Sequence, residues 1–292
     1  LRLKNPTILA SGIRGSTGSS LKRISREGGP SAVATKSVGM KARAGHSNPT
    51  VIEIEGGLLN AVGLSNPGIH EFKAEIETAK DGGVPVIVSV FGFAVDEFAD
   101  VAANAQEYGA DAIELNLSCP NVEKAGATYG QDPKLSRRVV ETVKGSVDIP
   151  VIAKLTANTN DIVEVASACA DAGCDGITAI NTLAAMKIDI RAKSPVLGNK
   201  TGGLSGPYIK PVALRCVYEI SKELDVPVIG CGGITTGEDA IEFLMAGAKA
   251  VEIGTGVHLR GIDVFKKVCG EIELFMKENG HKDLGEIIGA AL

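Results

Sequence analysis

Short apolar runs rich in Val and Ile alternate along the chain with longer stretches in which apolar residues recur every three or four positions. The short runs do not alternate cleanly with polar residues, which is typical of parallel strands covered on both faces. We therefore predict eight strands, at Thr7–Ala10, Ala32–Lys36, Val84–Val90, Ala112–Asn116, Pro150–Leu155, Gly176–Ile180, Pro227–Gly230 and Ala250–Ile253.

The stretches between these strands have the periodicity of helices. After Asp161, for example, Ile162, Val165 and Cys169 fall on one face, and the stretches that begin near residues 96, 213 and 241 repeat this spacing. Eight strand–helix units predict an α/β fold, a (β/α)8 TIM barrel, formed as a single domain over residues 1–292. The alternative is a doubly wound open sheet, which usually has fewer strands and an early glycine fingerprint.

Three segments, residues 39–64, 118–131 and 184–207, are longer than ordinary βα loops. We predict that they are long insertions at the C-terminal face of the barrel, where barrel enzymes hold their chemistry. The first contains the alternating stretch Thr50–Glu55 followed by two glycines. This pattern predicts a hairpin laid across the barrel mouth.

The composition of the chain argues against several classes of function. Of the 292 residues, 44% are hydrophobic and 22% are charged, and the formal net charge is −5. This balance argues against nucleic acid as a partner, and no apolar run approaches the ~20 residues of a membrane span. The six cysteines contain no Cys-x-x-Cys pair and the four histidines show no metal spacing, so we predict no metal and no iron–sulfur cluster in this chain. Sparse, irregular cysteines are typical of reduced thiols and favour the cytoplasm.

Glycines gather after the last two predicted strands. Gly230–Ile234 follows the seventh strand and Gly254–Gly256 follows the eighth. Paired glycine-rich loops at these two places form the usual phosphate site of a barrel, with backbone N–H groups facing the anion. The alternative is that the glycines only make tight turns. A phosphate site would not by itself distinguish a cofactor from a sugar-phosphate substrate.

Polar side chains end several of the predicted strands. Lys36, Asn116, Lys154 and Asn181 each end a different strand, and in a parallel barrel these ends share one rim. Lys154 is notable because a lysine inside an apolar strand is rarely buried without a partner. It could stabilise negative charge on a flavin ring or an enolate, or lie on the rim with its ammonium in solvent.

Cys119 follows the fourth predicted strand, which Pro120 should end because proline cannot donate to a strand ladder. The sequence thus predicts a thiol at a strand's carboxyl end, close to Asn116 and Asn121. Two amides can orient a planar polar ligand. The alternative is that Cys119 is a small buried hydrophobe, as most free cysteines are.

These motifs together resemble a known family. The collinear segments Lys36-Ser37, Asn60–Leu64, Asn116–Asn121, Asn181-Thr182, Gly202–Pro207, Gly232-Gly233 and Gly254-Thr255 span nearly the whole chain. They resemble the catalytic chain of the dihydroorotate dehydrogenase family. The resemblance implies one FMN at the barrel mouth and the oxidation of (S)-dihydroorotate to orotate in de novo pyrimidine (UMP) biosynthesis.

Site residues are carried over from the resemblance by position. Cys119 matches the general base, which takes a proton while FMN accepts a hydride. The positions that match flavin contacts are Ser11, Lys36, Ser37, Asn116, Lys154, Ile180, Gly206, Gly232, Gly233, Gly254 and Thr255. Those that match substrate contacts are Lys36, Asn60, Ala61, Val62, Gly63, Leu64, Asn116, Asn181 and Thr182. One departure is Ser89, where many relatives have Asn, which puts a flavin contact there in doubt.

The subclass follows from the same motifs. Cysteine as the base resembles the soluble class 1, and Asn60–Leu64 and Gly202–Pro207 resemble class 1B. That class pairs a homodimeric core of this chain with a partner subunit carrying FAD and a [2Fe-2S] cluster, as a heterotetramer that passes electrons to NAD. The alternatives are the fumarate-dependent class 1A, a related pyrimidine-reducing flavoenzyme and, more distantly, a non-redox barrel that binds a phosphate ligand.

Overall fold

The computed structural model describes residues 1–117 and 129–292, and in this part of the chain eight parallel strands close into a barrel. The strand order is β1-β14-β13-β8-β7-β6-β5-β2, and β1 pairs with both β14 and β2. The predicted TIM barrel is therefore confirmed and the open sheet is excluded. The strands are β1 (Thr7–Leu9), β2 (Ala32–Ala34), β5 (Val86–Val90), β6 (Ala112–Asn116), β7 (Val151–Leu155), β8 (Gly176–Ala179), β13 (Val228–Cys231) and β14 (Ala250–Ile253).

The strands are buried on both faces, which explains why their sequences do not alternate with polar residues. One set of alternate residues points inward, because successive side chains of a strand point to opposite faces. This inward set forms a small apolar cluster of Ile8, Ala32, Ala34, Ile87, Ala112, Ile152 and Ala250. Residues of the other set, such as Leu9, Val33 and Val88, join the large cluster shared with the helices.

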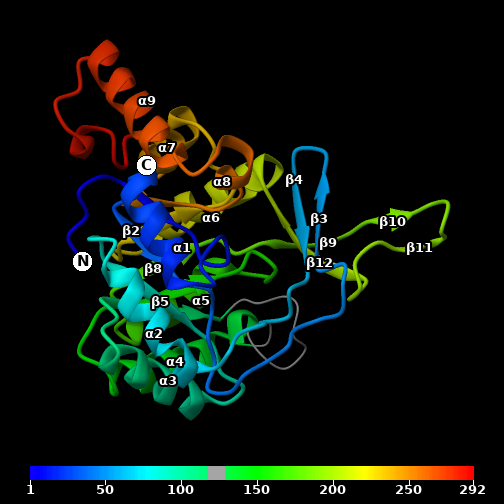
Figure 1. Cartoon of the computed structure of the whole chain (residues 1–292). Coiled ribbons are helices and arrows are strands. Elements are labelled where there is room, and N and C mark those ends of the chain that lie inside the picture. Colours follow the sequence, from blue (N-terminus) through cyan, green and yellow to red (C-terminus); the bar gives the residue numbers. More distant parts are fainter. Residues whose placement is uncertain (118–128) are drawn as a thin grey trace.

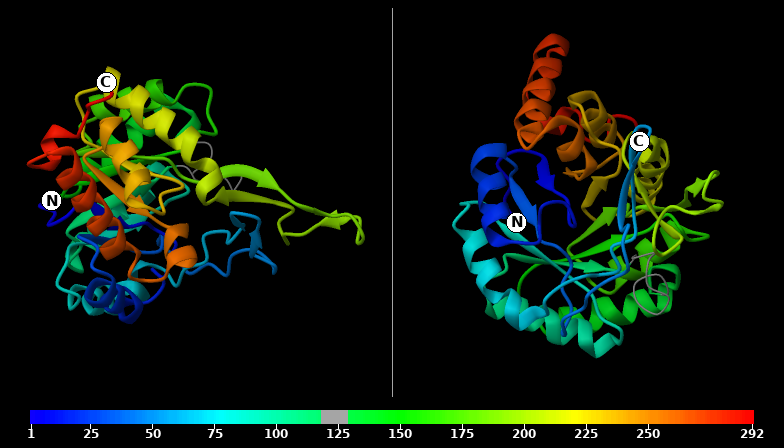
Figure 2. Two further views of the ribbon diagram at one scale, coloured as in Figure 1. Left: turned by 90° about the horizontal axis from the view of Figure 1, so that it is seen from above. Right: turned by 45° about the vertical axis from the view of Figure 1, so that its right-hand side comes forward.

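Helices form an outer layer around the strands (Figure 1; Figure 2, right). Four of them begin at side-chain caps that satisfy free backbone N–H groups; for example, Asp161 accepts from Val163 and Glu164, and Thr236 makes a capping box with Asp239. No helix of the described residues is long and apolar enough to cross a bilayer. The helices are α1 (Gly18–Arg23), α2 (Ile69–Lys80), α3 (Val95–Glu107), α4 (Pro133–Lys144), α5 (Ile162–Asp171), α6 (Lys210–Glu223), α7 (Gly237–Met245), α8 (Thr255–Arg260) and α9 (Val264–Asn279). Shorter turns are η1 (Ile24–Gly28), η2 (Tyr129–Gln131), η3 (Pro207–Ile209) and η4 (Leu284–Glu286).

A second sheet joins two insertions that are far apart in the sequence. The predicted hairpin is present as β3 (Val51–Ile54) and β4 (Gly57–Asn60). The third long segment, expected as a loop, contributes β12 (Thr201–Ser205), which pairs with β4, and β9 (Leu183–Met186). Because both insertions follow carboxyl ends of barrel strands, this sheet lies over the C-terminal face.

The same segment continues into an arm. Strands β10 (Ile188–Asp189) and β11 (Ser194–Pro195) pair with each other at its tip, and Figure 1 shows the arm projecting away from the barrel.

Candidate active site

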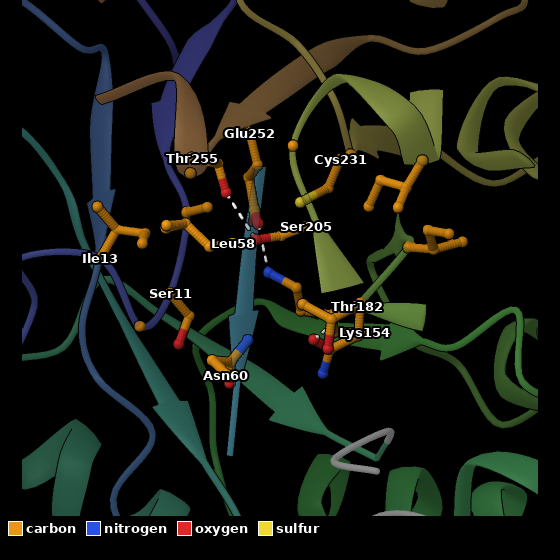
Figure 3. Close-up of a pocket in the computed structure, with 18 of the residues that line it drawn as sticks. Ser11, Ile13, Leu58, Asn60, Lys154, Thr182, Ser205, Cys231, Glu252 and Thr255 are labelled. Atoms are coloured by element: carbon orange, nitrogen blue, oxygen red, sulfur yellow. Dashed lines mark hydrogen bonds and ion pairs between the residues drawn. The ribbon is translucent and has the colours of Figure 1, made fainter. Parts of the chain in front are cut away.

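The carboxyl ends of the barrel strands and the second sheet enclose a cavity (Figure 3). The strand ends provide its floor and walls, and β4, β12 and the segment after β4 provide residues from the opposite side. Polar members of the lining are Ser11, Lys36, Ser37, Asn60, Glu114, Asn116, Lys154, Asn181, Thr182, Ser205, Glu252 and Thr255.

The structure brings together all the positions that the resemblance assigned to a flavin. Each lines this one cavity, from Ser11 after β1 to Thr255 after β14. The full set is Ser11, Lys36, Ser37, Asn116, Lys154, Ile180, Gly206, Gly232, Gly233, Gly254 and Thr255.

The positions assigned to the substrate line the same cavity with one exception. Asn60, Val62, Gly63, Leu64, Asn181 and Thr182 are part of the lining, as are the shared Lys36 and Asn116. Ala61 is not, because its side chain is fully buried and packs with Leu59 and Leu197 instead. Cys119, assigned as the base, lies outside the described residues.

Hydrogen bonds fix the amide of Asn116 at the end of β6. Its Nδ2 donates to Ser37 Oγ at 3.0 Å, and its Oδ1 lies 3.4 Å from Asn181 Nδ2, which donates to it. Behind Ser37, Ser89 is fully buried and its hydroxyl lies 2.9 Å from the Ser37 hydroxyl. Ser89 therefore supports Ser37 and does not line the cavity. The amide of Asn116 is held in one orientation, as recognition of a planar ligand requires.

The cavity floor holds a buried ionic cluster of Glu114, Lys154 and Glu252. The Lys154 ammonium lies 2.5 Å from Glu252 Oε2 and 3.3 Å from Glu114 Oε2. All three side chains are nearly inaccessible, at 6% for Lys154 and 1% for each glutamate. Figure 3 shows Lys154 pointing toward Glu252, with Cys231 beside them.

The position of this cluster follows from the strand pattern. Ala112, Ile152 and Ala250 belong to the apolar cluster inside the barrel. Two residues farther along each strand come Glu114, Lys154 and Glu252, which therefore form the next inward layer toward the mouth.

Burial and charge shift the proton affinities in this cluster. Burial, and then the nearby charge of Glu252, raise the pKa of Glu114 to about 8. Burial lowers the pKa of Lys154, but Glu114 and Glu252 outweigh that effect and hold the pKa above its usual range. Burial raises the pKa of Cys231 to about 12, so this thiol stays protonated near neutral pH.

Sequence reasoning missed Glu114 and Glu252. The signal was the one that singled out Lys154: each glutamate stands inside an apolar strand, in Ile113-Glu114-Leu115 and Val251-Glu252-Ile253. Buried charges are paired in folded proteins, so a lone lysine in one inner strand should prompt a search for acids in the others.

The glycine loops after β13 and β14 both reach the cavity. Gly232 and Gly233 have positive φ values of +132° and +79°, a region that side chains rarely adopt. A Cβ on Gly233 would also lie 2.7–2.9 Å from the backbone and Cβ of Lys210. The glycines thus allow close backbone approach on this side of the cavity.

Replacing Gly233 with Ala should destabilise the fold by roughly 1–3 kcal/mol, because strain at positive φ adds to a clash with backbone that cannot move aside. Gly173→Ala is the matched control: its φ is +85° but nothing lies within 4 Å of the added Cβ. Urea unfolding of both variants measures the difference. Equal losses would show that close packing at Gly233 does not matter.

Across the described residues, no three His, Cys, Asp or Glu side chains are arranged to hold a metal ion. The fold and cavity instead define a barrel enzyme with converging amides, hydroxyls and amines on one side and backbone glycine loops on the other. Such a site suits a planar, polar ligand that carries a phosphate.

The chain belongs to the dihydroorotate dehydrogenase family, whose sequence profile matches residues 1–276. This confirms the resemblance, and the family is one of flavin-dependent oxidoreductases.

Three relatives carry the same name, dihydroorotate dehydrogenase B (NAD(+)), catalytic subunit. The protein of Methanocaldococcus jannaschii is 54% identical over 295 residues, covering 100% of this chain and 95% of the relative. The protein of Methanothermobacter thermautotrophicus is 50% identical, and the match covers 100% of this chain and 96% of the relative. The protein of Pyrococcus abyssi is 51% identical, and the match covers 100% of this chain and 97% of the relative.

Proposed function

We propose that this chain is the FMN-carrying catalytic subunit of an NAD-linked enzyme that oxidises (S)-dihydroorotate to orotate in de novo pyrimidine biosynthesis. One observation carries the proposal: all positions that the resemblance assigns to FMN, although scattered from residue 11 to residue 255, line one cavity in a chain of this family.

The residues of the cavity fit FMN. The Gly232-Gly233 turn and the Gly254-Thr255 turn both line the cavity and offer backbone N–H groups to one phosphate group. At Gly233 the turn packs against Lys210 so closely that a Cβ would not fit. The buried ammonium of Lys154 suits the electron-rich end of a flavin ring. When bound, FMN would supply the two-electron acceptor that no side chain can provide.

The opposite side of the cavity suits the pyrimidine. Asn60, Asn116 and Asn181 bring three amides to the substrate's ring amides, and the ammonium of Lys36 can bind its carboxylate. Asn60 Nδ2 donates to the carbonyl of Gly203 at 3.2 Å, which ties β4 to β12. The second sheet therefore positions this amide over the barrel mouth.

Cys119 is the proposed general base, which takes a proton from C5 of the substrate. A thiol titrates near ~8.5 in water, so this role requires surroundings that favour the thiolate, or a pH above neutral. Cys231, which lines the cavity, is a poor base because burial keeps its thiol protonated.

The electron acceptor defines the proposed partner. The relatives are named as catalytic subunits of NAD(+)-linked enzymes. We infer a partner subunit with FAD and a 2Fe-2S cluster, joined to a homodimer of this chain in the cytoplasm. The class 1A alternative would instead reduce fumarate without a partner.

An absorption spectrum tests the proposal directly. The purified chain should be yellow, release one FMN per chain on denaturation, and bleach when dihydroorotate is added without oxygen. NAD reduction should require the partner subunit, and fumarate should not restore the colour. A colourless protein that cannot be loaded with FMN would contradict the proposal, and rapid fumarate turnover would favour class 1A.

A further inference from the structure

The buried cluster at the cavity floor has an unequal number of charges. Two carboxyl groups, of Glu114 and Glu252, share the single ammonium of Lys154. If all three were ionised, the cluster would carry a net charge of −1 in a region with almost no contact with water. Burying an uncompensated charge is costly, and a carboxyl group avoids the cost by taking up a proton.

The geometry distinguishes the two carboxyl groups. Glu252 lies closer to the ammonium, at 2.5 Å, and Thr178 Oγ1 donates to its other oxygen at 3.5 Å. Glu114 lies farther away, at 3.3 Å, and its Oε1 is buried with no hydrogen-bond partner among the described residues. Leaving that oxygen without a partner costs more in an ionised carboxylate than in a neutral acid, because the desolvation penalty is larger for a charged group.

In the part of the chain that the structure describes, Lys154 is the cation paired with Glu114. On β5 its neighbour in the ladder is the neutral Ser89, and on β7 the nearby charge is Lys154. Across the barrel it faces Glu252 on β14 and Cys231 on β13, whose thiol is protonated, with Thr178 on β8. Lys36, on the segment after β2, lines the same cavity.

We propose that Glu114 is a positioning residue that holds a proton at neutral pH, so that Glu252 is the only counter-ion of Lys154 and the cluster is neutral. A neutral cluster leaves the Lys154 ammonium able to stabilise negative charge in the cavity above it. When Glu114 loses its proton at higher pH, the cluster becomes negative and that stabilisation weakens. This last role rests on the proposed function, whereas the protonation of Glu114 does not.

Infrared spectroscopy of the purified chain tests the protonation, with or without FMN. At pH 7 the spectrum should contain the C=O stretch of a protonated carboxyl group, lost as the pH rises through about 8. Glu114→Gln should abolish this band, and Glu114→Asp should shift its frequency if the glutamine variant does not fold. Absence of the band in the wild-type chain, or its persistence in Glu114→Gln, would overturn the proposal.

The two glutamates provide a matched comparison. Gln imitates a protonated Glu, so Glu114→Gln should lower the FMN content at pH 7 much less than Glu252→Gln, which removes the counter-ion of Lys154. Equal losses, or a larger loss for Glu114→Gln, would contradict the assignment of the proton to Glu114.

The midpoint potential of the bound flavin tests the link to the cavity. Above pH 8 the midpoint potential of the wild-type protein should fall more steeply with pH than that of Glu114→Gln, with a slope up to twice as large. The reason is that, at this pH, reduction of the flavin is accompanied by uptake of an additional proton by Glu114. Parallel slopes would refute the link even if the infrared band is present. If the protein binds no flavin, the proposed function fails while the infrared result still decides the protonation.

Discussion

Lys154→Met should lower the free energy of unfolding by about 3–5 kcal/mol at neutral pH. Methionine keeps most of the side-chain volume but removes the ammonium that pairs with Glu114 and Glu252, leaving two nearly inaccessible carboxyl groups close together. Urea unfolding followed by circular dichroism measures the loss. FMN should be removed from both proteins first, since a ligand bound only to the folded state would add to the difference.

Lys210→Met is the matched control, because Lys210 also bridges two acids. Its ammonium lies 2.8 Å from Asp239 and 2.7 Å from Glu242, but the side chain is 24% exposed and Glu242 is 45% exposed. Solvent screens the pair with Glu242, and Asp239, although only 13% exposed, keeps the hydrogen bonds donated by the backbone of Thr235 and Thr236. The expected loss is therefore below about 1 kcal/mol. A similar loss for both lysines would show that burial does not determine the strength of the Lys154 cluster.

The loss in Lys154→Met should also depend on pH in a defined direction. Lys154 lowers the pKa of Glu114, so without the ammonium, burial and the charge of Glu252 raise that pKa still further above its value in the unfolded chain. A group with a raised folded-state pKa contributes stability that is lost as the pH rises through that pKa. The variant should therefore lose more stability relative to wild type at pH 8 than at pH 5.

The barrel was predictable because its signal is repeated eight times. Each buried strand is a short Val- and Ile-rich run, and a long periodic stretch separates it from the next. The hairpin of β3 and β4 was predictable for a similar reason, since Thr50–Glu55 alternates and a glycine turn follows.

The remaining strands of the second sheet were not predictable in the same way. Strand β9 reads Leu-Ala-Ala-Met, which lacks β-branched residues, and β12 contains Gly202 and Gly203. The pairing of β12 with β4 is tertiary, because β4 lies more than a hundred positions earlier in the chain. Local preference cannot reveal such a pairing, because the partner strand supplies the hydrogen bonds.

The candidate site also has one part that the sequence predicts and one part that it does not. Strand-end residues such as Asn116 and Lys154 were predictable because the ends of parallel strands share one rim. The charge balance of the cluster was not predictable, because it depends on which inward-pointing residues of β6, β7 and β14 lie at the same level along the barrel axis. That level is set by the strand register, in which Glu114 lies opposite Ile152 and Asn116 lies opposite Lys154.

The largest catalytic effect is expected for Cys119→Ala, which should slow the reduction of bound flavin by dihydroorotate by roughly 10²–10⁴-fold, the usual contribution of a general base. FMN content and absorption should remain close to wild type, because the proposed flavin contacts lie on other residues. Anaerobic stopped-flow absorbance measures the reduction step alone, without the partner subunit or the final acceptor.

Two further variants sharpen the interpretation of Cys119→Ala. Cys119→Ser should keep weak activity that rises with pH, because a hydroxyl is a much poorer base than a thiol at neutral pH. Cys269→Ala controls for the loss of a thiol away from the cavity: this half-buried residue on α9 lies near Thr7 and should leave the rate unchanged. Near-wild-type flavin reduction by Cys119→Ala would mean that another group takes the proton, and Cys119 would then not be the general base.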